Sequence, residues 1–238
     1  MIEAVVFDYG GVISSPLFRG IGAFEATSGY PRGSLLRLLF GEVTYVGVEG
    51  RAVAESLDDE SPADDGRQDH DWHRLERGEI DFATYFVGLR DRAPAILGRD
   101  LDVGAYERFM TSSAPGVQWP VVHRIRELKT TGLKLALLTN NIAEFSDHWR
   151  ATFPVDELFP IVVDSSAVGL RKPDPAIYLL TLEQVGTTPQ ATVFLDDNAD
   201  NVRAAHTLGM ETVHVGEDPW AAVDELDAIL DRRGVSPT

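Results

Sequence analysis

The sequence contains no cysteine and only three lysines, Lys129, Lys134 and Lys172, among its 238 residues. The absence of cysteine excludes disulfides, thiolate metal sites and cysteine nucleophiles. Positive charge is scarce altogether, because 21 lysines and arginines stand against 38 aspartates and glutamates, a formal net charge of −17. Such a chain repels the phosphate backbone of nucleic acid and the surface of an anionic membrane, so neither is expected as a partner.

Long hydrophobic runs are also missing. The apolar runs, for example 4–7, 135–138 and 161–163, are far too short to span a bilayer. The N-terminus has no basic start followed by an apolar stretch, so no signal peptide is expected and a cytoplasmic location is predicted. Hydrophobic residues nevertheless make up 44% of the chain, which excludes disorder of the whole chain. The length of 238 residues allows one large domain or two modest ones.

Five short runs of continuous apolar character predict strands that are buried on both faces of a parallel sheet. They are Ala4–Phe7, Lys134–Leu138, Ile161–Val163, Thr192–Leu195 and Thr212–Val215. From residue 118 onward the strands alternate with helical patterns. These patterns cover residues 121–128, Asp174–Val185 with Asp174 as N-cap, Ala199–Leu208 and Trp220–Leu230. The alternation predicts an α/β fold with a Rossmann-like parallel sheet and helices on both faces.

The stretch between the first two predicted strands breaks this rhythm and is mainly helical. Its helical patterns are Leu35–Phe40, Val46–Leu57, Trp72–Arg77, Phe82–Leu97 and Val103–Met110. An insertion of this kind predicts a core domain of residues 1–15 and 112–238 and a helical cap domain of residues 16–111. Residues 58–71 hold seven acids against one arginine, which predicts a solvated loop because like charges repel.

Several polar residues follow predicted strands, at the carboxyl edge where parallel sheets bind ligands. Asp8 follows the first strand and is a candidate nucleophile, although an aspartate there can also simply form a turn. Thr139 and Asn140 follow the second strand, and their groups either bind anionic oxygens or cap a helix. Lys172 lies in a proline-bracketed loop, where an ammonium suits a phosphoryl oxygen or a carboxylate unless it is a surface cation.

Asp196 and Asp197 follow a fourth buried strand as adjacent carboxylates. Their mutual repulsion is costly unless a cation compensates it, and hard oxygen ligands of this type suit Mg²⁺. An exposed helix-cap pair is the alternative. Together the candidates supply a nucleophile, a hydroxyl and an amide that can bind anionic oxygens, a cation, and a pair of carboxylates that can bind a metal ion. This set is what transfer of a phosphoryl group needs.

In this order and spacing, four segments resemble the motifs of the haloacid dehalogenase-like hydrolase superfamily. They are VVFDYGGVI at 5–13, LLTNN at 137–141, GLRKPD at 169–174 and FLDDNADNVRAAHTLGM at 194–210. The stretch LERGEID at 75–81 also looks like part of the small helical cap that one subfamily inserts after the first motif. Within the superfamily, this sequence looks most like a branch that is similar to sugar-phosphate phosphatases and to the amino-terminal phosphatase domain of soluble epoxide hydrolases.

The resemblance implies a role for each candidate residue. Asp8 would be the nucleophile and form an aspartyl-phosphate. Thr139 would bind the phosphoryl oxygens with Asn140 nearby, and Lys172 would orient Asp8 and neutralise developing charge. The substrate would be a small phosphorylated molecule, enclosed by the cap.

The resemblance also implies a Mg²⁺ site formed by Asp8, the main-chain carbonyl of Gly10 and Asp197, with Asp196 close behind them. Gly10 is a departure, because most phosphatases of the superfamily have a second aspartate there that protonates the leaving alkoxide. Loss of such a group typically costs about 10²–10⁴-fold in rate. A cap side chain could take its place, and the candidates are His70, Asp71, His73 and Glu76. Alternatively, the substrate could have a good leaving group that needs little protonation, or the protein could be weakly active or non-catalytic.

Three functions remain open from the sequence. The first is a Mg²⁺-dependent phosphatase, which core motifs alone do not distinguish from a phosphotransferase. The second is a 2-haloacid dehalogenase, which needs no second aspartate. Asp196 and Asp197 argue against it, because they would repel its anionic substrate. The third is a protein that binds phosphate or metal with weak or no turnover. A structural role is expected for the remaining histidines and aromatic residues, His123, His206, His214, Trp72 and Phe82–Phe86. The sequence predicts neither the identity of the substrate nor the oligomeric state.

Overall fold

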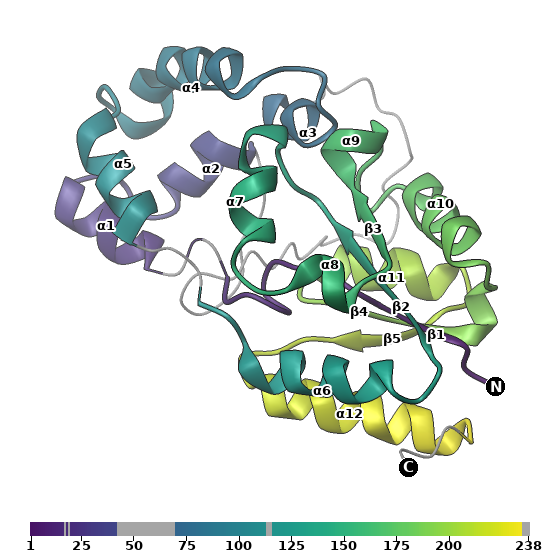
Figure 1. The fold of residues 1–238 in the computed structure, drawn as a ribbon. Coiled ribbons are helices and arrows are strands. Elements are labelled where there is room, and N and C mark those ends of the chain that lie inside the picture. The colour runs from purple at the N-terminus through teal and green to yellow at the C-terminus, as the bar shows by residue number, and fades with distance from the viewer. Residues whose placement is uncertain (17, 19, 42–69, 113–115, 235–238) are drawn as a thin grey trace.

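The computed structural model describes residues 1–16, 18, 20–41, 70–112 and 116–234. A five-stranded parallel sheet has the order β3-β2-β1-β4-β5 (Figure 1). Its strands are β1 (Ala4–Phe7), β2 (Lys134–Thr139), β3 (Ile161–Asp164), β4 (Thr192–Asp196) and β5 (Glu211–His214). Each predicted strand is found within one residue of its expected bounds, and the predicted α/β fold is confirmed.

Helices cover both faces of the sheet because successive side chains of a strand point to opposite faces. Val5 and Phe7 of β1 enter the apolar core on one face, under α6, α7, α8 and α12. Ala4 and Val6 enter the core on the other face, under α10 and α11 (Figure 1). The helices around the sheet are α6 (Trp119–Lys129), α7 (Ser146–Arg150), α8 (Val155–Leu158), α9 (Ser165–Val168), α10 (Pro175–Val185), α11 (Ala199–Thr207) and α12 (Pro219–Arg232).

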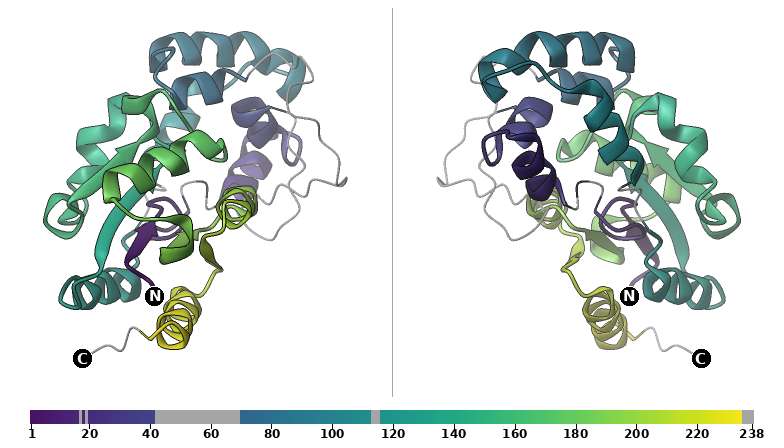
Figure 2. Two further views of the ribbon diagram at one scale, coloured as in Figure 1. Left: turned by 90° about the vertical axis from the view of Figure 1, so that its right-hand side faces the viewer. Right: turned by 90° about the vertical axis from the view of Figure 1, so that its left-hand side faces the viewer.

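A second group of helices, here called the helical unit, lies beyond the carboxyl ends of β2 and β3 (Figures 1 and 2). It comprises α1 (Ile21–Ser28), α2 (Ser34–Phe40), α3 (Asp71–Glu76), α4 (Phe82–Leu97) and α5 (Val103–Ser112). The unit has its own apolar core, in which Trp72 and Phe82 pack against buried residues such as Leu89. No described helix is long and apolar enough to cross a membrane.

Part of the predicted insertion lies outside the described residues. This applies to the helix expected over residues 46–57 and to most of the acidic stretch 58–71. The last two residues of that stretch are described and begin α3 rather than a loop. His70 is the N-cap, because its Nδ1 accepts a hydrogen bond from the main-chain N–H of Trp72 at 3.1 Å.

The chain leaves the sheet for the helical unit and returns to it along two adjacent segments. Ser14 and Val117 form an antiparallel bridge. The main-chain N–H of Ser15 donates to the carbonyl of Gly116 at 2.8 Å, and the N–H of Gly116 donates to the Ser15 hydroxyl at 3.0 Å. The outgoing and returning chains are therefore tied together where they meet the sheet.

Candidate active site

Strand register brings the polar candidates to one edge of the sheet. Phe7 of β1 lies opposite Leu195 of β4, so Asp8 and Asp196, the next residue on each chain, lie at the same level. The main-chain N–H of Asp8 still donates to the carbonyl of Leu195, at 2.9 Å. Phe7 also lies opposite Leu137 of β2, which brings the end of that strand, with Thr139, to the same edge.

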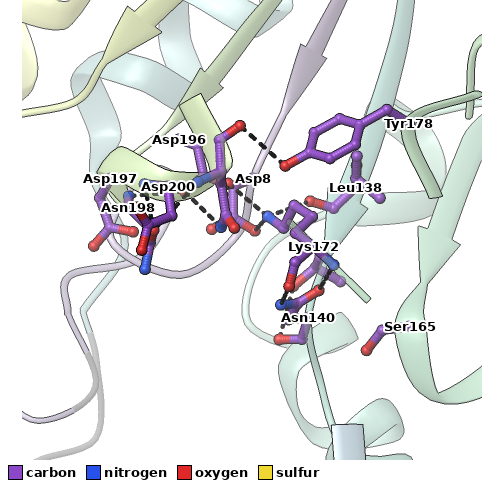
Figure 3. Close-up of polar contacts among 12 residues, drawn as sticks. Asp8, Leu138, Asn140, Ser165, Lys172, Tyr178, Asp196, Asp197, Asn198 and Asp200 are labelled. Atoms are coloured by element: carbon purple, nitrogen blue, oxygen red, sulfur yellow. Dashed lines mark hydrogen bonds and ion pairs between the residues drawn. The ribbon is translucent and has the colours of Figure 1, made fainter. Parts of the chain in front are cut away.

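Lys172 is the cation at the centre of this edge (Figure 3). Its side chain is only 1% exposed, and Nζ lies 2.8 Å from Asp8 Oδ1 and 2.7 Å from Asp196 Oδ2. Nζ also donates to the carbonyl of Leu138 at 3.0 Å, so all three ammonium hydrogens have acceptors. Burial opposes the charge on Lys172, but the two carboxylates outweigh burial and raise its pKa, so the side chain stays charged.

The Asp8 carboxyl is buried and surrounded by more negative than positive charge. Burial raises its pKa to about 7; the Lys172 ammonium opposes this shift and Asp196 adds to it. Near neutral pH the isolated site therefore holds Asp8 only partly ionised. An additional cation beside Asp8 would favour the carboxylate form, which is the form that acts as a nucleophile.

The three carboxylates at the carboxyl ends of β1 and β4 fit a small, hard cation. Asp8, Asp196 and Asp197 each offer one oxygen, and these atoms lie within 4.8 Å of one another. Oxygen ligands are those that Mg²⁺ prefers. Gly11 makes this approach possible: its φ is 71°, and a Cβ built there would lie 1.9 Å from Asp197 Oδ2. The backbone after β1 therefore lies directly against the Asp197 carboxylate.

Asp196 is fully buried, and its carboxylate is already engaged by protein donors. Besides Lys172, it accepts from the Asn201 side-chain amide at 3.1 Å and from the main-chain N–H of Asn198 at 2.8 Å. Asn198 is in turn the N-cap of α11, because its side chain accepts from the N–H groups of the first turn. The start of α11 thus holds Asp196 against the ammonium.

Thr139 and Asn140 differ in what they contact. The Asn140 side chain binds both main-chain groups of Lys172: Nδ2 donates to its carbonyl at 3.0 Å, and Oδ1 accepts from its N–H at 2.8 Å (Figure 3). Thr139 is 2% exposed at the end of β2, and its hydroxyl contacts the carbonyl of Asn140 at 3.4 Å. Asn140 therefore attaches the loop that carries Lys172 to the end of β2.

The position of Gly10 is open, as a Cβ built there has no atom of the described residues within 4 Å. The four side chains considered as substitutes for a missing acid are engaged elsewhere. Glu76 binds an arginine and Asp71 pairs with two arginines of the helical unit. His70 caps α3, and the ring of His73 meets the ring of His70 edge-on. Within the described part of the chain, none of them occupies the space beside Gly10.

Sequence reasoning passed over Ser165, which directly follows β3. Its side chain is fully buried; its hydroxyl accepts from the N–H of Asn141 at 3.0 Å and donates to the carbonyl of Glu76 at 2.6 Å. The predicted strand ended at Val163, so the signal that singled out Asp8 and Thr139 pointed to Asp164; the observed strand is one residue longer. His214, expected to be structural, places Nε2 3.0 Å from the main-chain oxygen of Asp197.

Comparison with known proteins places this geometry in a family. A model of haloacid dehalogenase-like hydrolases matches residues 2–209. The chain belongs to this family. The chain is 30% identical over 231 residues to acyl-CoA dehydrogenase family member 10 of Mus musculus. The matched region covers 96% of this chain but only 19% of the mouse protein. The hydrolase is 35% identical over 161 residues to a sesquiterpene phosphatase of Aspergillus oryzae, covering 67% of this chain and 79% of the relative.

A solved structure shares the fold of this hydrolase. It is a HAD family enzyme of Bacteroides thetaiotaomicron in complex with magnesium and inorganic phosphate. The TM-score is 0.59 at 20% identity, with 94% of this chain and 99% of that chain covered. The family resemblance seen in the four sequence motifs is confirmed by the family model, and the solved structure agrees in fold.

Proposed function

We propose that this hydrolase is a Mg²⁺-dependent phosphatase that acts on a small phosphorylated metabolite, with Asp8 as nucleophile. The observation that carries the proposal is the buried pairing of Asp8 with Lys172 at 2.8 Å beside two further carboxylates. Phosphoryl transfer needs a positioned nucleophile and positive charge facing the phosphoryl oxygens. A phosphatase among the relatives supports the same reaction class.

In the proposed reaction the Asp8 carboxylate attacks phosphorus, and the bond to the leaving oxygen breaks. The resulting aspartyl-phosphate is then hydrolysed by water, which releases inorganic phosphate and regenerates Asp8. Lys172 orients Asp8 through Oδ1 and offsets negative charge. Thr139, at the end of β2, is proposed to donate to a phosphoryl oxygen, and Asn140 to hold the Lys172 loop in place.

We propose the following ligands for the metal. Asp8, Asp197 and the main-chain carbonyl of Gly10 would hold Mg²⁺, with Asp196 supporting Lys172 behind them. When bound, the ion would offset the negative charge of the carboxylates and of the phosphoryl group.

We also propose that residues 16–111 act as a cap over a core of residues 1–15 and 112–238. The apolar cluster of the helical unit supports this division, since all its buried members but Ile142 lie within residues 16–111. The paired segments at Ser14 and Val117 support it as well. A cap of this kind would exclude water from the site during the reaction.

The test is release of inorganic phosphate from a panel of phosphate monoesters by the purified protein. Turnover is expected with Mg²⁺, is expected to stop on addition of EDTA, and is expected to be absent in Asp8→Asn. Absence of metal-dependent turnover on every ester would contradict the proposal. Transfer of phosphate to an added alcohol instead of water would identify a phosphotransferase, and chloride release from a 2-haloacid would identify a dehalogenase.

One observation favours a second candidate, a protein that binds phosphate and metal with little turnover. Gly10 supplies no acid, and the space beside it is empty of described atoms. Such a protein would bind a phosphate mimic such as orthovanadate in the presence of Mg²⁺ yet hydrolyse no ester. Calorimetric titration with the mimic, run beside the ester panel, separates the two candidates.

A further inference from the structure

Glu76 connects the helical unit to two loops of the candidate site. It is the last residue of α3 and only 6% exposed. Its side-chain Oε2 accepts from Arg171 Nε at 2.6 Å, and its main-chain oxygen accepts from the Ser165 hydroxyl at 2.6 Å. α3 therefore meets the core at α9 and at the loop after it, as Figure 1 shows.

The first connection leads to Lys172. Arg171 is joined to Lys172 by one peptide bond, and the main chain of Lys172 is held on its other side by Asn140. The Lys172 ammonium in turn binds Asp8. Every link in this series is a direct bond or a hydrogen bond, so the series connects Arg171 to the ammonium beside the nucleophile.

The second connection leads to the loop after β2. The Ser165 hydroxyl that donates to Glu76 also accepts from the N–H of Asn141 at 3.0 Å. Asn141 directly follows Thr139 and Asn140, so α3 stabilises the segment proposed to bind the phosphoryl oxygens. One residue of the helical unit is thus linked to both sides of the site, to one through Arg171 and to the other through Ser165.

The fit between α3 and α9 is close. Gly78, two residues beyond Glu76, has φ 67°, and a Cβ there would lie 2.6 Å from the carbonyl oxygen of Ser166. The Glu76 side chain, which pairs with Arg171, is 8% exposed. The side chain of nearby Glu79, which pairs with Arg77, is 45% exposed. A desolvated pair of this kind is sensitive to loss of one partner, while an exposed pair contributes little.

We propose that Glu76 is a positioning residue, which makes the placement of Lys172 and of residues 139–141 depend on docking of α3 against the core. The site is then assembled for turnover only while the helical unit is seated. This inference rests on the proposed phosphatase function.

Kinetics of matched variants test the inference. Glu76→Ala is expected to lower kcat for p-nitrophenyl phosphate by about 10- to 100-fold at saturating Mg²⁺, because small misplacements of catalytic groups have effects of this size. Glu76→Gln keeps an acceptor for Arg171 and should retain more activity than Glu76→Ala. Glu79→Gln is the control and should keep the wild-type kcat. A purely structural role would lower the melting temperature of Glu76→Ala but leave kcat unchanged well below it.

Hydrogen exchange provides a readout that does not depend on turnover. In Glu76→Ala, amides in residues 139–142 and 165–172 should exchange faster than in the wild type, and in Glu79→Gln they should not. Gly78→Ala, which forces α3 away from Ser166 but keeps Glu76, should show the same pattern. Wild-type kcat and wild-type exchange in Glu76→Ala would overturn the inference. If the wild type hydrolyses no phosphate ester, the proposed function is refuted. Hydrogen exchange would still decide whether Glu76 positions residues 139–141 and Lys172.

Discussion

At the scale of single residues, one buried ammonium lies between the carboxylates of Asp8 and Asp196, and a third carboxylate, Asp197, lies close to these two. Burial raises the pKa of Asp8 to about 7, the Lys172 ammonium opposes this shift, and Asp196 adds to it. The carboxylate form of Asp8 is therefore disfavoured in the folded protein unless a further cation is bound. This raised pKa has measurable consequences at Asp8, and the open position at Gly10 has others.

Stability without metal should fall with rising pH because of Asp8. Its pKa of about 7 in the folded protein lies above the ordinary value of 3.8, so between these values the folded chain holds a proton that the unfolded chain releases. The stability present below pH 3.8 is lost as pH rises through 7. We expect Asp8→Asn to be more stable than the wild type at pH 8, by about 1 kcal/mol or more. The difference should shrink toward pH 4.

Urea unfolding of both proteins in EDTA, over a series of pH values, measures this difference. Parallel pH profiles for the wild type and Asp8→Asn would show that Asp8 is not the group responsible.

Gly10 can be tested by supplying the acid it lacks. Gly10→Asp should fit, because the position is open, and should raise kcat/KM on alkyl phosphates by up to about 10²–10⁴-fold. The gain should be smaller on p-nitrophenyl phosphate, whose leaving group needs little protonation. Gly10→Asn has the same shape without the acid and is the control; equal rates for the two variants would contradict a role for proton transfer.

At the scale of elements, the site is formed by turns that follow parallel strands. Continuous apolar runs predict these strands well because each strand is buried on both faces. The turns also depend on contacts between strands that are distant in sequence. The turn after β1 is an example, since Gly11 lies directly against Asp197 of the turn after β4.

Gly11→Ala should weaken Mg²⁺ binding more than it weakens the fold. The new Cβ would collide with the Asp197 carboxylate, and φ of 71° is unfavourable for alanine. Affinity should fall by about 10- to 100-fold, as it does when groups that support metal ligands are altered. Gly10→Ala adds the same methyl group in open space and should bind Mg²⁺ normally. Calorimetric titration of Mg²⁺ into both variants is the measurement, and equal affinities would contradict the model of the site.

At the scale of the whole molecule, the net charge of −17 and the local charge of the site have different effects. Distributed negative charge disfavours polyanionic partners and is screened by any salt. The buried carboxylate cluster would instead be neutralised by binding one specific cation.

Mg²⁺ should therefore stabilise the protein beyond the effect of ionic strength. At a concentration of about 100 times its dissociation constant, it should raise the free energy of unfolding by about 2.7 kcal/mol. The comparison is thermal unfolding in MgCl₂ and in NaCl at equal ionic strength. Asp197→Asn should remove the excess stabilisation by Mg²⁺ and keep the response to NaCl. Equal stabilisation by the two salts in the wild type would indicate screening alone.

The fold and the candidate residues were largely predictable from local patterns. Burial on two faces produces continuous apolar strands, and a position directly after such a strand marks Asp8, Thr139 and Asp196 because parallel strands present their carboxyl ends at one edge. Asp174 was likewise recognisable as a helix N-cap, and its side chain does accept from the N–H of Ala176. These features depend on a few neighbouring residues, so one sequence contains them.

Contacts between distant segments were decided only by the tertiary structure. Binding of Lys172 by both Asp8 and Asp196 requires three separate loops to converge, and the attachment of Glu76 to Arg171 and Ser165 joins the helical unit to the core. The sequence marked Glu76 only as a candidate acid, because it shows which residues are charged but not which partner each one meets. Partners are selected by packing and burial across the whole chain, where an unpaired buried charge is too costly to remain.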